Sequence, residues 1–207
     1  MVATHQCTEH DRLLIARDLN VGLAYCHLLG VIHRDIAARN VLLSGTNPVR
    51  VKLCDFGLGA EADAEVETRF PIAVPWAAPE ALSYQFSPAS DVWSYAVTLW
   101  ELYAEGARMY DDWGPASPFG TKNLQLFIDA LKSGRVLPRP QLCPVPIYTA
   151  MCQCWSFDVA NRCSLEQVLD VIEAELMAFE QHEAEVEFST FEDAGYSEPG
   201  AASYVDI

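Results

Sequence analysis

The stretch His33–Gly57, HRDIAARNVLLSGTNPVRVKLCDFG, decides the fold of this 207-residue chain. Within it, two short apolar runs flank the turn-forming sequence Ser44–Pro48, and this pattern predicts a β-hairpin. The hairpin joins two loops, one carrying Asp35 and Asn40 and the other carrying Asp55. The rest of the chain is interpreted as a scaffold for these three polar residues.

The three side chains offer a simple chemistry. Carboxylate and amide oxygens are hard ligands, so Asp55 and Asn40 suit Mg²⁺ better than zinc. Because Mg²⁺ also binds phosphate oxygens, Asp35 is left to accept or orient the proton of a hydroxyl group. Phosphoryl transfer requires little more than positioning and charge neutralisation. Gly57 is expected to let the backbone bend sharply beside the metal ligand.

Three motifs in order carry a resemblance to a known family. They are HRDxxxxN at 33–40, DFG at 55–57 and APE at 78–80, and together they resemble the protein-kinase signature set. Further along the chain, Asp91 resembles the start of the buried central helix of the kinase C-terminal lobe. Arg162 resembles the Arg that bonds the Glu of the APE motif in that family.

The subgroup is indicated by the residues between Asp35 and Asn40. Ala37-Ala38-Arg39 resembles the catalytic loop of tyrosine kinases, whereas serine/threonine kinases usually have Lys where this chain has Ala37. Four further segments look most like the Ack-like non-receptor tyrosine kinases: 76–80, 86–91, 97–101 and 137–148.

The resemblance implies a role for each polar residue of the two loops. Asp35 would be the catalytic base, and Arg39 would help to place the phenol of a protein substrate. Asn40 and Asp55 would hold Mg²⁺ and the phosphates of ATP. The implied function is ATP-dependent phosphoryl transfer to protein tyrosine hydroxyls.

Four neighbouring residues receive packing or binding roles from the same resemblance. Leu42 and Cys54 would line the adenine side of the nucleotide cleft. His33 and Phe56 would be internal residues that hold the loops in place.

The expected fold is a mostly α-helical, kinase-like C-terminal lobe over residues 1–178, with an acidic, disordered tail over 179–207. Helical periodicity and end signals predict helices at about 9–29, 91–104, 124–134, 147–155 and 164–178. Pro71, Pro75 and Pro79 indicate a long loop over 58–80. The Gly- and Pro-rich connection 105–121 is assigned no function.

No glycine-rich loop and no strand with a VAIK-type Lys stands before His33. We therefore expect the N-terminal lobe to be absent and ATP binding by this chain to be impaired. A truncated gene model or fragment is the simplest interpretation. The alternative is a natural, non-catalytic form that acts as an interaction or docking module.

Composition excludes several classes of protein. The formal net charge of −16 argues against nucleic acid or anionic membrane as the main partner. The apolar runs are too short for a membrane segment and the first ten residues do not form a signal peptide, so a cytoplasmic protein is expected. An odd count of seven cysteines without a CxxC pattern indicates reduced thiols.

The activation segment departs from the family pattern. Residues 55–80 contain no Tyr and no Ser, yet Arg34 resembles an Arg that often binds an activation-loop phosphate. We hypothesise that a carboxylate takes the place of that phosphate, the alternative being a solvated acidic loop. The candidates are Glu61, Asp63, Glu65 and Glu67.

The tail contains two tyrosines in acidic, small-residue surroundings, Tyr196 and Tyr204. Once phosphorylated, either would offer a charge for the Arg cluster of an SH2-type partner. Two alternatives remain open: an inert tail, and a PDZ ligand formed by Val205–Ile207.

Overall fold

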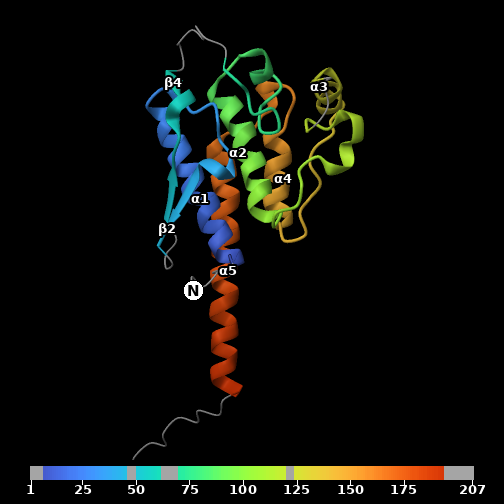
Figure 1. Ribbon diagram of the computed structural model, residues 1–207. Helices are drawn as coiled ribbons and strands as arrows, with labels where there is room; N and C mark the ends of the chain where they lie inside the picture. The colour runs from blue at the N-terminus through green and yellow to red at the C-terminus, as the bar shows by residue number, and fades with distance from the viewer. Residues whose placement is uncertain (1–6, 46–49, 62–69, 120–123, 194–207) are drawn as a thin grey trace, which may run out of the picture.

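The computed structural model describes residues 7–45, 50–61, 70–119 and 124–193. These residues are mostly helical and include two small antiparallel sheets (Figure 1). The mostly α-helical fold with a β-hairpin between the two loops is therefore confirmed. The α-helices are α1 Glu9–Leu28, α2 Pro88–Tyr103, α3 Leu124–Lys132, α4 Val145–Cys154 and α5 Leu165–Asp193, and the strands are β1 Val31–Ile32, β2 Val41–Ser44, β3 Arg50–Leu53 and β4 Ala60–Glu61.

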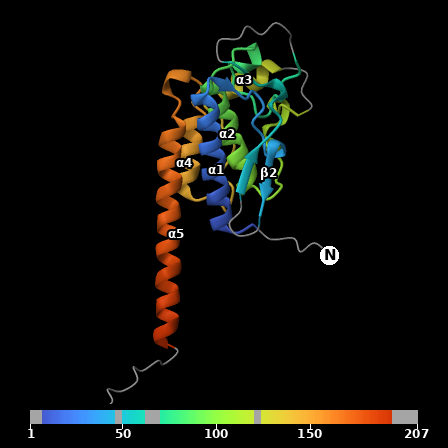
Figure 2. The same cartoon turned by 90° about the vertical axis from the view of Figure 1, so that its left-hand side faces the viewer.

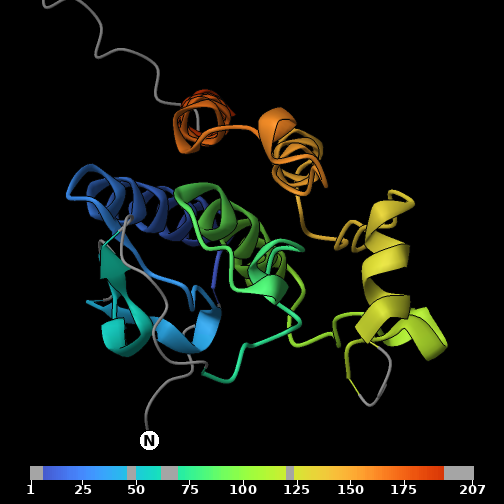
Figure 3. The same cartoon turned by 90° about the horizontal axis from the view of Figure 1, so that it is seen from above.

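Helix α2 lies in the middle of the molecule, with α1 and the hairpin on one side and α3 on the other (Figure 3). Nearly all of its side chains are buried, as its apolar sequence predicts. Tyr95 Oη donates to the carbonyl of Ala16 in α1 at 2.9 Å, and Trp100 Nε1 donates to the carbonyl of Pro138 at 2.7 Å. These bonds satisfy the polar ends of large aromatic side chains, so that their rings can be buried.

The first turn of α2 lies earlier than the sequence prediction near Asp91. Ser87 is the N-cap residue, and its Oγ accepts from the amide of Ser90 at 3.3 Å. Ser90 Oγ in turn accepts from the amide of Ser87 at 3.0 Å. This is a capping box in which Ser stands where Glu or Gln usually does.

Helix α1 begins and ends as predicted. Thr8 Oγ1 accepts from the amide of Asp11 at 3.1 Å, and Asp11 Oδ2 accepts from the amide of Thr8 at 3.0 Å. After the helix, Gly30 has φ +74°, a left-handed conformation that suits glycine. Asn20 Nδ2 donates to the carbonyl of Leu165 at 3.0 Å, which fixes α1 against the start of α5.

The pairing of β1 with β4 was not predicted. Val31 lies opposite Glu61, and Ile32 lies opposite Ala60. Strands of two residues are too short to show an alternating pattern in the sequence. The pairing returns the segment that follows the DFG motif to the residues that precede His33.

Helix α5 corrects the predicted tail boundary. Its capping box is confirmed, since Gln167 donates its amide to Ser164 Oγ at 3.2 Å. The helix then continues to Asp193 and extends past the other helices (Figure 2). The prediction of disorder is wrong for residues 179–193, because acidic composition does not by itself distinguish a solvated helix from a disordered segment, and Glu and Ala favour helix. Residues 194–207, with Tyr196 and Tyr204, lie outside the described residues.

The connection that follows α2 is ordered over residues 105–119. Tyr110 and Trp113 are buried there, and the Tyr110 ring packs edge-on against Trp113 and against Phe127 of α3, at centroid distances of 4.9 and 5.3 Å. Arg135 covers the Trp113 ring at 4.6 Å. This aromatic cluster attaches α3 to the rest of the domain.

All seven cysteines are free thiols, as predicted. Within the described ranges, no helix combines the length and the apolar character needed to cross a bilayer.

Candidate active site

A buried carboxylate holds the backbone of the HRD loop. Asp91, in the first turn of α2, accepts from the amide of His33 at 2.8 Å and from the amide of Arg34 at 2.9 Å. His27 Nε2 lies 3.0 Å from the same carboxylate. Arg34 has a left-handed backbone at φ +69°, an unfavourable conformation that these bonds stabilise.

The side chains of Asp35 and Asn40 are brought together, as the sequence predicts. Asn40 Nδ2 donates to the Asp35 carbonyl at 2.7 Å and to Asp35 Oδ2 at 2.8 Å. Arg39 Nη2 contacts the other carboxylate oxygen, Oδ1. Asp35 is thereby fixed in one rotamer, with its carboxylate near the surface and oriented by two partners.

Asp55 lies close in the fold to Asn40, because the amide of Cys54 donates to the Asn40 carbonyl at 3.0 Å. Asp55 itself has a left-handed backbone at φ +62°, and its Oδ1 accepts from the amide of Gly57 at 3.3 Å. A Cβ at position 57 would lie 3.1 Å from that oxygen. A side chain at position 57 would therefore be in tight contact with the Asp55 carboxylate. The strained backbone that the sequence predicted at Gly57 is found at Asp55 instead.

The donor set fits a magnesium ion. Asn40 Nδ2 donates twice to Asp35, and no donor in the described part of the chain contacts Asn40 Oδ1, so this amide oxygen is available to a ligand. In the described ranges no group of three His, Cys, Asp or Glu forms a metal cage made by protein alone. One amide and one carboxylate leave further positions for phosphate and water oxygens, which is the usual coordination of Mg²⁺ at phosphate sites.

Of the two residues predicted to be internal, His33 is buried and Phe56 is not. His33 is completely buried, and its Nε2 lies 3.1 Å from the Cys54 carbonyl. Phe56 packs on the His33 ring at 4.7 Å but is 45% exposed, so the expectation that it is internal is wrong. It follows the left-handed turn at Asp55, which directs the chain toward the surface.

The two residues predicted to line the adenine side of the cleft differ in their exposure and contacts. Leu42, in β2, is 55% exposed and lies opposite Lys52. Cys54 is half-buried, and its thiol donates to the Asn40 carbonyl at 3.2 Å. Their role at a nucleotide remains a prediction.

Glu101 is a site residue that the sequence analysis did not identify. Its Oε2 accepts from the amide of Ala38 at 3.0 Å and from Trp76 Nε1 at 2.7 Å. The Trp76 ring lies 4.7 Å below the guanidinium of Arg39. One carboxylate at the end of α2 thus connects the HRD loop to the segment that precedes the APE motif. The only sequence signal for it would have been an acidic residue in a helix that is otherwise apolar.

A cavity of about 820 Å³ lies beside the contacts that Glu101 makes with Ala38 and Trp76. It is lined by Ala38, Trp76 and Glu101 and by residues of the 105–119 connection, among them Arg108, Met109 and Phe119. Trp76 therefore both lines the cavity and packs under the Arg39 guanidinium. The 105–119 segment, which was assigned no function from the sequence, therefore borders the candidate site.

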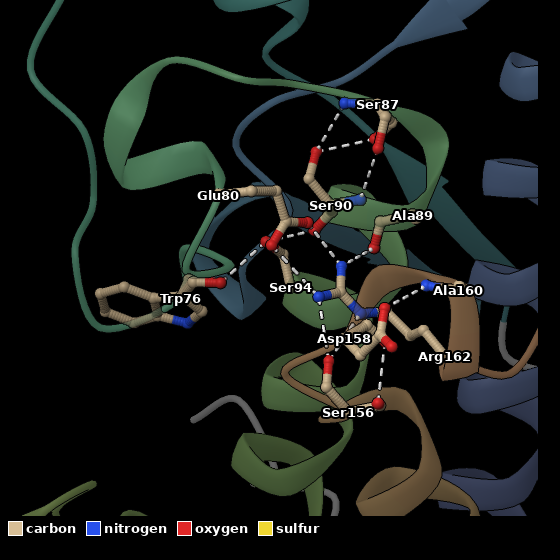
Figure 4. Close-up of polar contacts among 10 residues, drawn as sticks. All are labelled: Trp76, Glu80, Ser87, Ala89, Ser90, Ser94, Ser156, Asp158, Ala160 and Arg162. Carbon is tan, nitrogen blue, oxygen red and sulfur yellow. Dashed lines mark hydrogen bonds and ion pairs between the residues drawn. The ribbon is translucent and has the colours of Figure 1, made fainter. Parts of the chain in front are cut away.

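The APE motif is fixed by the predicted ion pair with Arg162 (Figure 4). Arg162 Nη1 lies 2.6 Å from Glu80 Oε1, and Nη2 lies 3.2 Å from Oε2. The guanidinium also donates to the carbonyls of Ala89 and Ser156 at 2.7 and 3.1 Å. This network joins the end of the activation segment to the start of α2 and to the loop after α4.

The carboxylate hypothesis for Arg34 is tested only in part. Its guanidinium lies over the Phe86 ring at 5.1 Å, and its Nε is buried without a hydrogen-bond partner. Glu61 is exposed in β4. Asp63, Glu65 and Glu67 lie outside the described residues, so the hypothesis stays a prediction.

Comparison with known proteins agrees with this arrangement. The family model for protein tyrosine and serine/threonine kinases matches residues 2–172. The chain is 37% identical over 164 residues to ephrin type-A receptor 8 of Rattus norvegicus, covering 76% of this chain and 41% of that protein. It is 34% identical over 163 residues to ephrin type-A receptor 7 of Gallus gallus, and 34% identical over 164 residues to human ephrin type-A receptor 8, covering 76% of this chain and 15% of each relative. The chain thus spans less than half the length of these relatives.

Proposed function

The chain belongs to the protein tyrosine and serine/threonine kinase family, and we propose that its His33–Gly57 segment serves the transfer of a phosphoryl group from ATP to a tyrosine hydroxyl of a protein substrate. The observation that carries the proposal is the pair of hydrogen bonds that Asn40 Nδ2 donates to the carbonyl and to the carboxylate of Asp35. It supports a base of fixed orientation next to an amide oxygen that is available to a metal. This combination of groups meets the positioning requirement of phosphoryl transfer.

Asp35 acts on the acceptor hydroxyl. One carboxylate oxygen pairs with Arg39 and the other with Asn40, so the carboxylate cannot rotate away from an incoming phenol. A carboxylate within hydrogen-bond reach of the hydroxyl can orient it and accept its proton as the bond to phosphorus forms.

Asn40 and Asp55 would hold Mg²⁺ together with the phosphates of ATP. The ion supplies neutralisation of the phosphate charge. Leu42 and Cys54 remain the proposed contacts of the adenine ring. The 207 residues include no glycine-rich loop and no VAIK-type Lys, so we propose that efficient ATP binding requires a polypeptide that also carries these elements.

Tyrosine is the proposed acceptor because of the surface around Arg39. Its guanidinium is held between the Asp35 carboxylate and the Trp76 ring, where a phenol ring can pack beside it. The adjoining cavity at Trp76 and Glu101 would accept residues that flank the acceptor tyrosine. Ala37, which stands where serine/threonine kinases usually have Lys, also supports a tyrosine acceptor.

The finer assignment to Ack-like kinases rests on the motif residues alone. The relatives named above are ephrin receptors, and they do not support that subtype. The proposal is therefore limited to a tyrosine-specific protein kinase.

The test is the substitution Asp35→Asn in a protein that carries this chain with a glycine-rich loop and Lys-bearing strand. We expect the rate of tyrosine-peptide phosphorylation to fall by roughly 10²–10⁴, the usual contribution of a positioned base. Asp170→Asn, on the exposed face of α5, is the matched control and should keep the full rate.

Peptides that differ only at the acceptor test the substrate class. We expect phosphorylation of the Tyr peptide and none of the Ser or Phe peptides. A fully active Asp35→Asn protein would refute the role of Asp35, and equal rates on Tyr and Ser would refute tyrosine specificity.

A further inference from the structure

Two cysteines that belong to different segments meet at the end of α4. The sulfur atoms of Cys154 and Cys163 are 3.0 Å apart. Cys154 is the last residue of α4, and Cys163 lies shortly after the 3₁₀ turn Val159–Asn161. The amide of Cys163 donates to the Gln153 carbonyl at 3.4 Å, so the backbones of the two segments also lie side by side. Both thiols are free.

The two sulfurs differ in access. Cys154 is completely buried in the core, whereas Cys163 is partly exposed. Cys163 lines a cavity of about 420 Å³ that is open to solvent and is also lined by His27 and Arg162. Cys163 therefore borders space that is open to solvent, whereas Cys154 is buried and does not line this cavity.

The contact also shifts the pKa values of the two thiols in opposite directions. The hydrogen bond from Cys154 lowers the pKa of the Cys163 thiol, and the Arg162 charge lowers it further, against an opposing effect of burial. The same hydrogen bond, together with burial, raises the pKa of Cys154. The thiolate, which is the nucleophile in cysteine chemistry, thus forms on the accessible sulfur.

We propose that Cys163 and Cys154 form a redox pair, in which a hydroperoxide oxidises Cys163 and Cys154 then closes a disulfide with it. In the first step the Cys163 thiolate attacks one oxygen of hydrogen peroxide. The O–O bond breaks, hydroxide leaves, and Cys163 becomes a sulfenic acid. The sulfur loses two electrons and the peroxide gains them.

In the second step the Cys154 sulfur attacks the Cys163 sulfur. The S–S bond forms and the S–O bond breaks, and the departing hydroxide takes the Cys154 proton and leaves as water. Because the two sulfurs are already in contact, this step should be faster than further oxidation of the sulfenic acid. A dithiol reductant reverses the reaction by thiol–disulfide exchange.

The bond would act on a segment that matters for the fold. Residue 163 follows Arg162, whose guanidinium binds Glu80 and the carbonyls of Ala89 and Ser156. A disulfide would therefore fix the loop after α4 to the C-terminal end of α4, next to the network of Arg162 (Figure 4).

The test uses the complete 207-residue chain, first reduced and then exposed to hydrogen peroxide. Remaining thiols are alkylated, the protein is digested without reductant, and the peptides are identified by tandem mass spectrometry. We expect a cross-linked peptide that joins Cys154 to Cys163 and disappears after treatment with dithiothreitol. Cys152→Ser, two residues away on the same helix, is the matched control and should keep the cross-link.

Two variants separate the steps. In Cys154→Ser, the sulfenic acid at Cys163 has no partner, and dimedone should label it. In Cys163→Ser, the buried Cys154 should remain unlabelled. The proposal is overturned if the wild-type chain forms no Cys154–Cys163 bond under peroxide, or if Cys154 is labelled when Cys163 is absent. Neither readout depends on kinase activity, so the result stands apart from the proposed function.

Discussion

Replacement of Arg162 by Met should destabilise the fold strongly. The Arg162 side chain is 0% exposed, and the Glu80 side chain is 15% exposed. Met preserves most of the apolar stem, but it removes every donor and also the guanidinium that lies over the Trp93 ring at 5.2 Å. The largely buried Glu80 carboxylate and the partly buried residues Ala89 and Ser156 would then lose those bonds.

The size of the loss follows from this geometry. Removing one partner of a buried, hydrogen-bonded ion pair costs about 3–5 kcal/mol, because the remaining charge is uncompensated. In a chain of this length each kcal/mol lowers the unfolding midpoint by about 2–4 °C, so a loss of about 3–5 kcal/mol should lower it by about 6–20 °C. The control is Arg135→Met, where the pair with Asp112 is 39% and 69% exposed and is worth about 0–1 kcal/mol.

The assay is urea unfolding followed by far-UV circular dichroism, with the thermal midpoint as a second measurement. The double variant Glu80→Gln, Arg162→Met removes the uncompensated charge and should be more stable than Arg162→Met alone. The reasoning is refuted if Arg162→Met loses no more stability than Arg135→Met, or if the double variant is as unstable as the single one.

Three further predictions concern other parts of the chain. Asp91→Asn replaces one accepting oxygen by an amide NH₂ group, which then faces the backbone amide of either His33 or Arg34. Urea unfolding should therefore show a loss of about 2–3 kcal/mol, and an unchanged free energy of unfolding would contradict the assigned role of Asp91. Burial and the neighbouring Glu9 raise the pKa of Glu175, which means that its ionised form destabilises the folded state. Glu175→Gln should therefore raise the thermal midpoint at neutral pH, and this gain should vanish as the pH falls below about 4.3, where the carboxyl is protonated in both states; a pH-independent difference would argue against the shift. Finally, if Tyr196 and Tyr204 dock SH2 domains, mass spectrometry should find them phosphorylated beside an active kinase, and their absence from the phosphopeptides would count against docking.

Local signals were sufficient for much of the secondary structure. The capping boxes at Thr8 and Ser164 predicted two helix starts, since each depends on residues only three apart. The capping box at Ser87 was not predicted, because the residue three positions after this N-cap is Ser90 rather than Glu or Gln. The length of α5 was missed because the acidic sequence after residue 178 was interpreted by composition rather than by helix propensity.

The sequence by itself determined which chemistry is available, because the order Asp35, Asn40, Asp55 within one short stretch specifies a base and two oxygen ligands. Only the tertiary structure decided how that chemistry is held. Asp91 binds His33 across 58 residues, Glu101 binds Ala38 across 63, and Arg162 binds Glu80 across 82. Contacts at such separations exist only after the intervening chain has been ordered, which costs conformational entropy that the packed core around α2 must offset. For this reason the residues of the site can be read from their local motifs, whereas their positioning partners become identifiable only in the folded molecule.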